Sequence, residues 1–151
     1  MISADRGDAR MAHADATVTV LVYSDNRNTR EQGRLALGRR PAADLPEIEY
    51  LECATAPAVV RALDLHATGG AQIDLLILDG EAVPEGGMGL CRQLKDEIHG
   101  CPPVLLLIAR PQDSWLATWS GADAVITRPV EPAVLAEAVA TLLRSRLAGN
   151  N

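Results

Sequence analysis

Short apolar runs alternate with amphipathic segments along most of this chain, and this alternation limits the folds it can adopt more than any other feature. Four runs are rich in leucine or β-branched residues and almost wholly apolar, at 18–23, 73–78, 104–108 and 124–127. Such runs are typical of strands buried on both faces. A fifth run, 48–53, alternates polar and apolar residues, so we expect it nearer an edge of the sheet.

Helical patterns occupy the gaps between these runs, at 29–38, 58–67, 88–98, 112–120 and 131–147. In the third of them Cys91, Leu94 and Ile98 form one apolar stripe, which should face the core. The first carries Leu35 and Leu37 as candidate core residues and stops at a glycine, a common signal for the end of a helix. Asp113 or Ser114 is the expected cap of the short helix at 112–120.

Strand and helix therefore follow one another five times, which predicts a five-stranded parallel sheet with helices on both faces. We expect one domain over residues 17–148, preceded by a disordered tail at 1–16 and followed by a short tail at 149–151. In 151 residues we expect no room for a separate DNA-binding or enzymatic domain.

Charge and composition exclude several classes of function. The 14 Lys and Arg residues against 20 Asp and Glu give a net charge of −6, which disfavours nucleic-acid binding. The chain shows no apolar run long enough to span a membrane and no signal peptide. Its 3 cysteines are an odd number at wide spacing and predict no disulfide framework. A cytoplasmic protein without membrane or nucleic-acid partners is expected.

Polar residues follow the predicted strands at the points where they end. Ser24 and Asp25 follow the first strand, Asp79 the third, and Arg128 the fifth. Because the carboxyl ends of parallel strands meet at one edge of a sheet, these side chains should share a cleft. Two neighbouring carboxylates need a counter-charge, either a hard cation such as Mg²⁺ or the arginine.

The chain is similar to the receiver domains of two-component response regulators, which have flavodoxin-like topology. The similarity rests on these residues and on the segments 20–25, 74–79, 103–107 and 121–129. The resemblance covers about residues 18–143. It implies that Asp79 is the phosphoacceptor. It also implies that Asp25, Asp79 and the backbone carbonyl of Glu81 are the residues that hold Mg²⁺.

Several positions depart from the family pattern. Ser24 replaces the first acid of the metal site, Ile108 replaces a Thr or Ser that would hold the phosphoryl group, and Arg128 replaces a lysine. Val125 stands where the family has a Tyr or Phe. A planar guanidinium does not reproduce a compact ammonium. These changes predict that Mg²⁺ binds weakly or not at all, and we expect Arg128 to pair with Asp79 instead.

The resemblance implies a signalling protein without enzymatic activity, whose partner is a histidine kinase or a downstream protein target, with a homodimer as a further option. Two alternatives stay open. One is a constitutive docking module whose Asp79 is never phosphorylated. The other is a flavodoxin-like cofactor binder, against which stand the acidic segment after the first strand and the small number of aromatic residues.

Three further features have competing interpretations. Trp115 and Trp119 lie one turn apart in the short fourth helix and either pack on the sheet or form a partner face. The cysteines, with His66 and His99, lack the spacing of a metal site and are better explained as ordinary core or surface side chains. The glycine-rich segment 86–89 lacks a phosphate-binding spacing and is expected to be a mobile loop.

Overall fold

The structure is a computed structural model that describes residues 17–149. The predicted tail 1–16, and the predicted C-terminal tail beyond Gly149, lie outside the described residues. Five strands form one sheet in the order β2-β1-β3-β4-β5, and all neighbours pair in parallel. They are β1 (Thr17–Tyr23), β2 (Glu47–Cys53), β3 (Leu75–Asp79), β4 (Val104–Ile108) and β5 (Ala124–Thr127). The predicted parallel α/β fold is confirmed, as is the edge position of the strand at 48–53.

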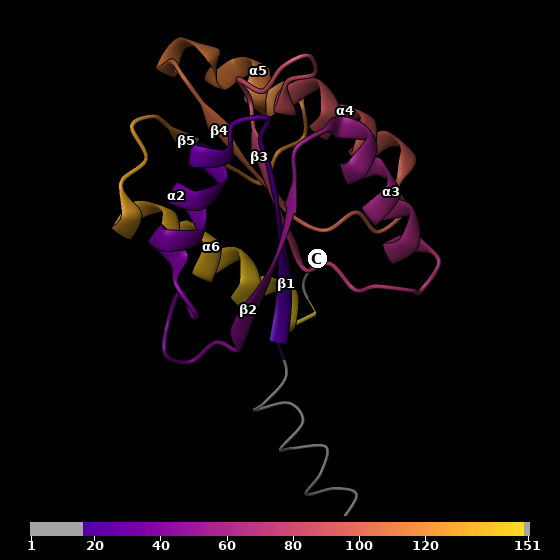
Figure 1. Ribbon diagram of the computed structural model, residues 1–151, viewed down its shortest axis with the longest axis vertical. Helices are drawn as coiled ribbons and strands as arrows, with labels where there is room; N and C mark the ends of the chain where they lie inside the picture. Colours follow the sequence, from indigo (N-terminus) through magenta and orange to yellow (C-terminus); the bar gives the residue numbers. More distant parts are fainter. Residues whose placement is uncertain (1–16, 150–151) are drawn as a thin grey trace, which may run out of the picture.

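Helices cover both faces of the sheet (Figure 1). On one face lie α2 (Arg27–Leu37) and α6 (Pro132–Leu147), and on the other lie α3 (Ala56–Ala67) and α4 (Gly87–Glu97). A 3₁₀ turn, η1 (Pro111–Asp113), leads into the short helix α5 (Ser114–Trp119). Because β3 and β4 lie between two helical layers, every one of their side chains is buried. This burial explains their uninterrupted apolar sequence.

The core is divided by the sheet into two layers. Beneath α2 and α6, alternate residues of the strands pack together, among them Val22, Ile77 and Leu107. On the opposite side Tyr23, Leu78 and Ile108 pack with residues of α3 and α4, including Cys91 and Leu94 of the predicted apolar stripe. In the described part of the chain, no helix is both long enough and apolar enough to cross a membrane.

Some local predictions were wrong. Leu35 is 71% exposed rather than part of the core, whereas Leu37 on the same helix is buried as expected. The helix expected at 112–120 is split into η1 and α5. Asp113 takes the N-cap position of α5 as predicted, although its side chain makes no capping hydrogen bond. The predicted end of the first helix is confirmed: Gly38 has φ +64°, a conformation that residues with a Cβ rarely adopt.

Candidate functional site at the carboxyl edge of the sheet

Asp79 is the last residue of β3 and the centre of the site, with only 3% of its surface exposed. Its Oδ1 accepts hydrogen bonds from Arg128 Nη2 at 2.6 Å and from the backbone N–H of Glu81 at 2.9 Å. Its Oδ2 accepts a hydrogen bond from the Ser24 hydroxyl at 2.7 Å. A buried carboxylate requires such partners, because an unpaired charge in the interior is very costly. The predicted contact between Asp79 and Arg128 is thus present.

Arg128 reaches Asp79 because β5 ends beside β4. The backbone N–H of Arg128 donates to the carbonyl of Ile108 at 2.8 Å, which fixes the start of the loop that follows β5. The side chain crosses to Asp79, where its Nη2 forms a charge-assisted hydrogen bond. Its Nε is buried and has no hydrogen-bond partner among the described residues. One N–H of the guanidinium is therefore left unsatisfied next to the site.

Ser24 comes directly after β1 and is fully buried. Its hydroxyl oxygen also accepts a hydrogen bond from the backbone N–H of Asn26 at 3.0 Å, so one side chain connects the turn after β1 to Asp79. Arg30 donates to the backbone carbonyl of Ser24 at 2.6 Å and forms an ion pair with Glu52. Sequence reasoning missed the role of Arg30. Its position one turn into the first helix, next to the acidic turn, was the available signal.

Asp25 lies at the same edge but faces the loop after β3. It is exposed, and its Oδ1 accepts a hydrogen bond from the backbone N–H of Val83 at 3.2 Å. The same loop is held by Tyr23, whose hydroxyl donates to the carbonyl of Glu85 at 2.5 Å. Burial raises the pKa of Tyr23, and the carboxylates of Glu85, Asp25 and Asp79 raise it further. Sequence reasoning did not identify Tyr23, because an aromatic residue inside an apolar strand gives no sign of what its hydroxyl contacts.

Residues 87–89 of the glycine-rich segment belong to the first turn of α4, so the expected loop at 86–89 was wrong. Gly86 caps α4 and Gly87 is its first residue. A Cβ on Gly87 would lie 2.8 Å from the carbonyl oxygen of Asp79, and one on Gly86 would lie 2.8 Å from that of Gly80. These glycines let the start of α4 pass close to the backbone of the acceptor turn.

The residues present do not fit a resident Mg²⁺ ion. Mg²⁺ requires several oxygen ligands in octahedral geometry. Here both oxygens of Asp79 already accept hydrogen bonds, Asp25 bonds to Val83, and the hydroxyl of Ser24 donates where a second acid would stand. Within residues 17–149, no cluster of three or more His, Cys, Asp or Glu side chains could hold a metal ion. The charge next to Asp79 comes from Arg128.

Ile108, the residue in place of the Thr or Ser, is fully buried and packs in the core layer beneath α3 and α4. It supplies no hydroxyl to the site. Val125, in place of the Tyr or Phe, is 36% exposed on β5.

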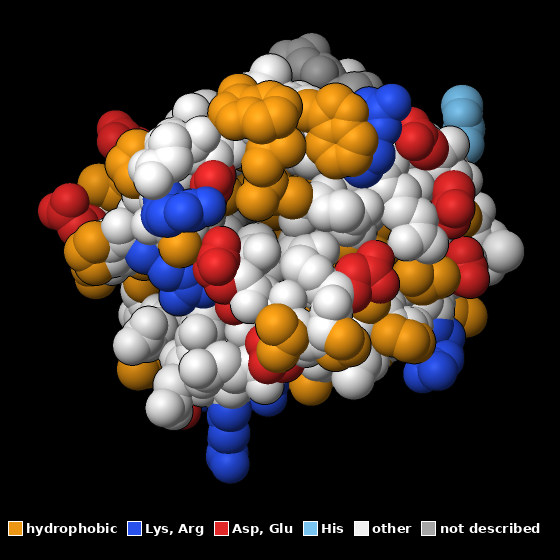
Figure 2. All heavy atoms as spheres, turned by 90° about the horizontal axis from the view of Figure 1, so that it is seen from above, with side chains coloured by type: hydrophobic (Ala, Val, Ile, Leu, Met, Phe, Trp, Pro, Cys, Tyr) orange, Lys and Arg blue, Asp and Glu red, His pale blue; other side chains and the backbone are white. Residues whose placement is uncertain are grey.

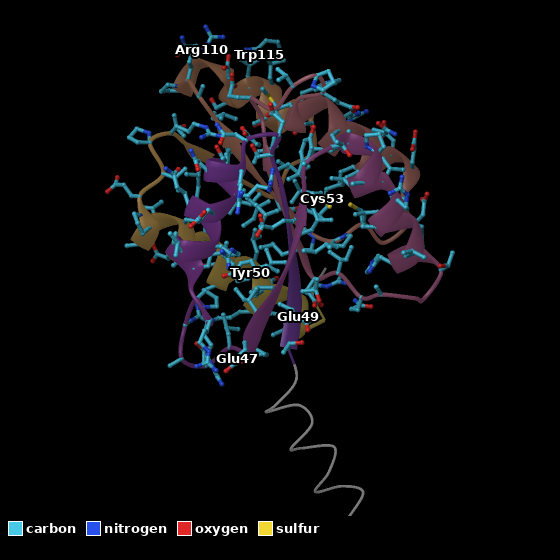
Figure 3. All side chains as sticks on the ribbon, viewed as in Figure 1. Glu47, Glu49, Tyr50, Cys53, Arg110 and Trp115 are labelled. Atoms are coloured by element: carbon cyan, nitrogen blue, oxygen red, sulfur yellow. The ribbon has the colours of Figure 1, made fainter. Side chains whose placement is uncertain are left out.

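Trp115 and Trp119 project from α5 into solvent and are 67% and 54% exposed, so the interpretation that they pack on the sheet is wrong. The guanidinium of Arg92 lies over the Trp119 ring, 5.4 Å from its centroid. Figure 2 shows large hydrophobic side chains gathered with a basic one at the rim of this end of the molecule. In Figure 3, Trp115 and Arg110 lie at this end, whereas Glu47 and Glu49 lie at the opposite end. We call Trp115, Trp119 and Arg92 the tryptophan face.

The thiols and His66 have ordinary structural surroundings. Cys53 and Cys91 are buried, and burial raises the pKa of both thiols; burial also raises the pKa of Cys101, to about 11. His66 Nδ1 accepts a hydrogen bond from the backbone N–H of Ile73 at 3.0 Å. Burial, and secondarily the charge of Arg146, lowers the pKa of His66.

Known proteins resemble this chain in sequence and in fold. No protein-family model matches the chain. Two curated proteins from Mycobacterium tuberculosis strains, each named an uncharacterized response regulatory protein, are 52% identical over 135 residues. The alignment covers 89% of this chain and 98% of each relative. This chain belongs to the response regulator family.

Solved receiver structures share the fold of this response regulator. A CheY-like receiver domain from Methanospirillum hungatei is 19% identical, with a TM-score of 0.64 over 89% of this chain and 99% of that one. A signal receiver domain of a histidine kinase from Syntrophus aciditrophicus is 28% identical, with a TM-score of 0.65 over 85% and 91%. A protein from Chloroflexus aurantiacus, named a putative response regulator, is 22% identical, with a TM-score of 0.70 over 85% and 98%. The chain is a receiver domain of two-component signalling.

Proposed function

We propose that this receiver acts through protein contacts, and that Arg128 holds its acceptor-position residue, Asp79, in place of a metal ion. Phosphorylation of Asp79 is then slow and incomplete, and the surface that partners bind exists without it. The observation that carries this proposal is the 2.6 Å hydrogen bond from Arg128 to a carboxylate that is almost wholly buried.

The expectation of slow phosphorylation at Asp79 follows from the chemistry of acyl phosphate formation. A carboxylate oxygen of Asp79 would have to attack phosphorus, so it must be accessible and rich in negative charge. Here Oδ1 accepts two N–H donors and Oδ2 accepts a hydroxyl donor. Each donor withdraws charge from the nucleophile, and Ile108 offers no hydroxyl to the incoming phosphoryl oxygens. The arrangement stabilises the unphosphorylated carboxylate and offers little stabilisation to a phosphorylated form.

The tryptophan face is our assignment for the protein contact. Tryptophan and arginine are the side chains most often responsible for interface binding energy, and here three of them lie together. Between residues 17 and 149 the structure describes only the receiver fold, so a signal from these residues must leave through their surface. A histidine kinase, a downstream protein or a second copy of the chain is the kind of partner we expect.

Modification with acetyl phosphate and Mg²⁺ tests the state of Asp79, with intact-mass spectrometry as the readout. We expect the wild-type protein to gain much less than one phosphoryl group per chain. A variant that restores the family pattern, with Ser24→Asp, Ile108→Thr and Arg128→Lys, should gain more, and adding Asp79→Asn should abolish the gain. Complete, Mg²⁺-dependent modification of the wild type that is lost in Asp79→Asn would overturn the proposal, whether or not the restored variant folds.

A further inference from the structure

A pocket of about 550 Å³ opens between α2 and α6, and Arg128 is one of its lining residues. Its volume lies in the range of about 300–1,000 Å³ that is usual for small-molecule sites. Val22, Ile77 and Leu107 line it from three neighbouring strands, and Leu35 of α2 forms part of its wall. Leu35 is the strongly exposed leucine that the sequence placed in the core, so an apolar wall is left uncovered here.

Arg128 is the only charged side chain that lines this pocket. Its guanidinium donates to Asp79 through Nη2, but its Nε is buried and unpartnered among the described residues. A buried N–H without an acceptor is costly, and an N–H on a cation bonds most strongly to an anion. The pocket thus combines a mainly apolar lining with one cationic side chain, whose guanidinium has N–H groups beyond the one that Asp79 accepts.

We propose that this pocket binds a small apolar carboxylate. The carboxylate accepts hydrogen bonds from Arg128, and the hydrocarbon part contacts Leu35 and the three strand residues. This inference goes beyond the proposed function. Because one guanidinium serves both acids, the ligand and Asp79 compete for Arg128, and occupancy of the pocket is linked to the state of the acceptor site.

Titration calorimetry of the full chain with octanoate, and with 1-octanol as a neutral molecule of the same chain length, tests the proposal. We expect saturable binding of one octanoate per chain, with an affinity about tenfold or more above that of octanol. Asp79→Asn removes the competing charge and should tighten octanoate binding. Absence of saturable octanoate binding, equal affinity for the two probes, or weaker octanoate binding in Asp79→Asn would overturn the proposal.

Two variants locate the binding site. Gly33 lines the pocket, and a Cβ there would meet no atom nearer than 4.0 Å, so Gly33→Leu should fill the pocket and abolish octanoate binding. Gly89→Leu on α4 is the matched control, because a Cβ there has open space and lies outside the pocket; it should bind as the wild type does. Arg128→Gln should remove the preference for octanoate over octanol. Unchanged octanoate binding in Gly33→Leu, or an unchanged preference in Arg128→Gln, would place any binding elsewhere and contradict the proposal.

Discussion

Ser24 shows how one side chain substitutes for part of the family's site. In place of an acid that would add charge and repel Asp79, its hydroxyl donates to Asp79 and also accepts from Asn26. The replacement changes a site suited to bind a cation into one that stabilises a lone carboxylate. Arg128 completes that change by bringing a permanent positive charge on a side chain.

Ser24→Ala should therefore destabilise the fold. It removes one donor to a buried carboxylate and the acceptor of the Asn26 N–H, so we expect the free energy of unfolding to fall by about 1–3 kcal/mol. Chemical denaturation measures this loss. Ser114→Ala is the control, because Ser114 is exposed and its hydroxyl makes no hydrogen bond in the described structure; its effect should stay within about 0.5 kcal/mol. Equal effects of the two substitutions would show that Ser24 does not support Asp79.

At the scale of elements, His66 joins the end of α3 to the segment that leads into β3. Its Nδ1 accepts from the N–H of Ile73, and a protonated imidazole cannot accept that bond. The pKa of His66 is lowered from 6.5, chiefly by burial, so the unfolded chain binds a proton more readily than the folded one. The contribution of His66 is therefore fully present above pH 6.5 and is lost as the pH falls from there toward the folded pKa.

His66→Gln should reduce this pH dependence. The free energy of unfolding, measured by denaturation at about pH 7.5 and about pH 5, should decrease less in the variant than in the wild type. His99→Gln is the control, since His99 is exposed, and its free energy of unfolding should show the same pH dependence as that of the wild type. If both variants follow the wild type, the imidazole of His66 does not contribute to acid sensitivity.

At the scale of elements, the strands and helices were more predictable from the sequence than the loops. The apolar patterns predicted buried parallel strands, and the shared edge at their carboxyl ends brought Ser24, Asp79 and Arg128 together as expected. The direction of Asp25 depends on the path of the loop after β3, which no periodicity encodes. Leu35 was misplaced because the spacing of apolar residues in α2 does not show that a pocket separates it from α6. The six-residue α5 is too short for its pattern to define a buried face, so the exposure of its tryptophans was left open.

At the scale of the whole molecule, we propose that signalling passes through the tryptophan face. A substitution that removes part of this face should leave the fold intact. Trp115→Ala removes a largely exposed ring, so we expect a change in unfolding free energy within about 0.5 kcal/mol. Self-association or capture of a cognate kinase should fall by about tenfold or more, as measured by analytical ultracentrifugation or biosensor binding. Val134→Ala is the control, because Val134 is also exposed but lies on α6. A loss of stability without a loss of association would refute the partner face.

We propose that the signalling surface of this receiver, the tryptophan face, does not depend on a metal ion. The central claim is the replacement of that ion by Arg128. A double-mutant cycle with Arg128→Gln and Asp79→Ala, measured by chemical denaturation with and without millimolar Mg²⁺, tests it most directly. We predict a coupling energy of about 1.5–3 kcal/mol that Mg²⁺ does not change. A coupling energy below about 0.5 kcal/mol, or one that Mg²⁺ abolishes while it stabilises the wild type, would contradict the account.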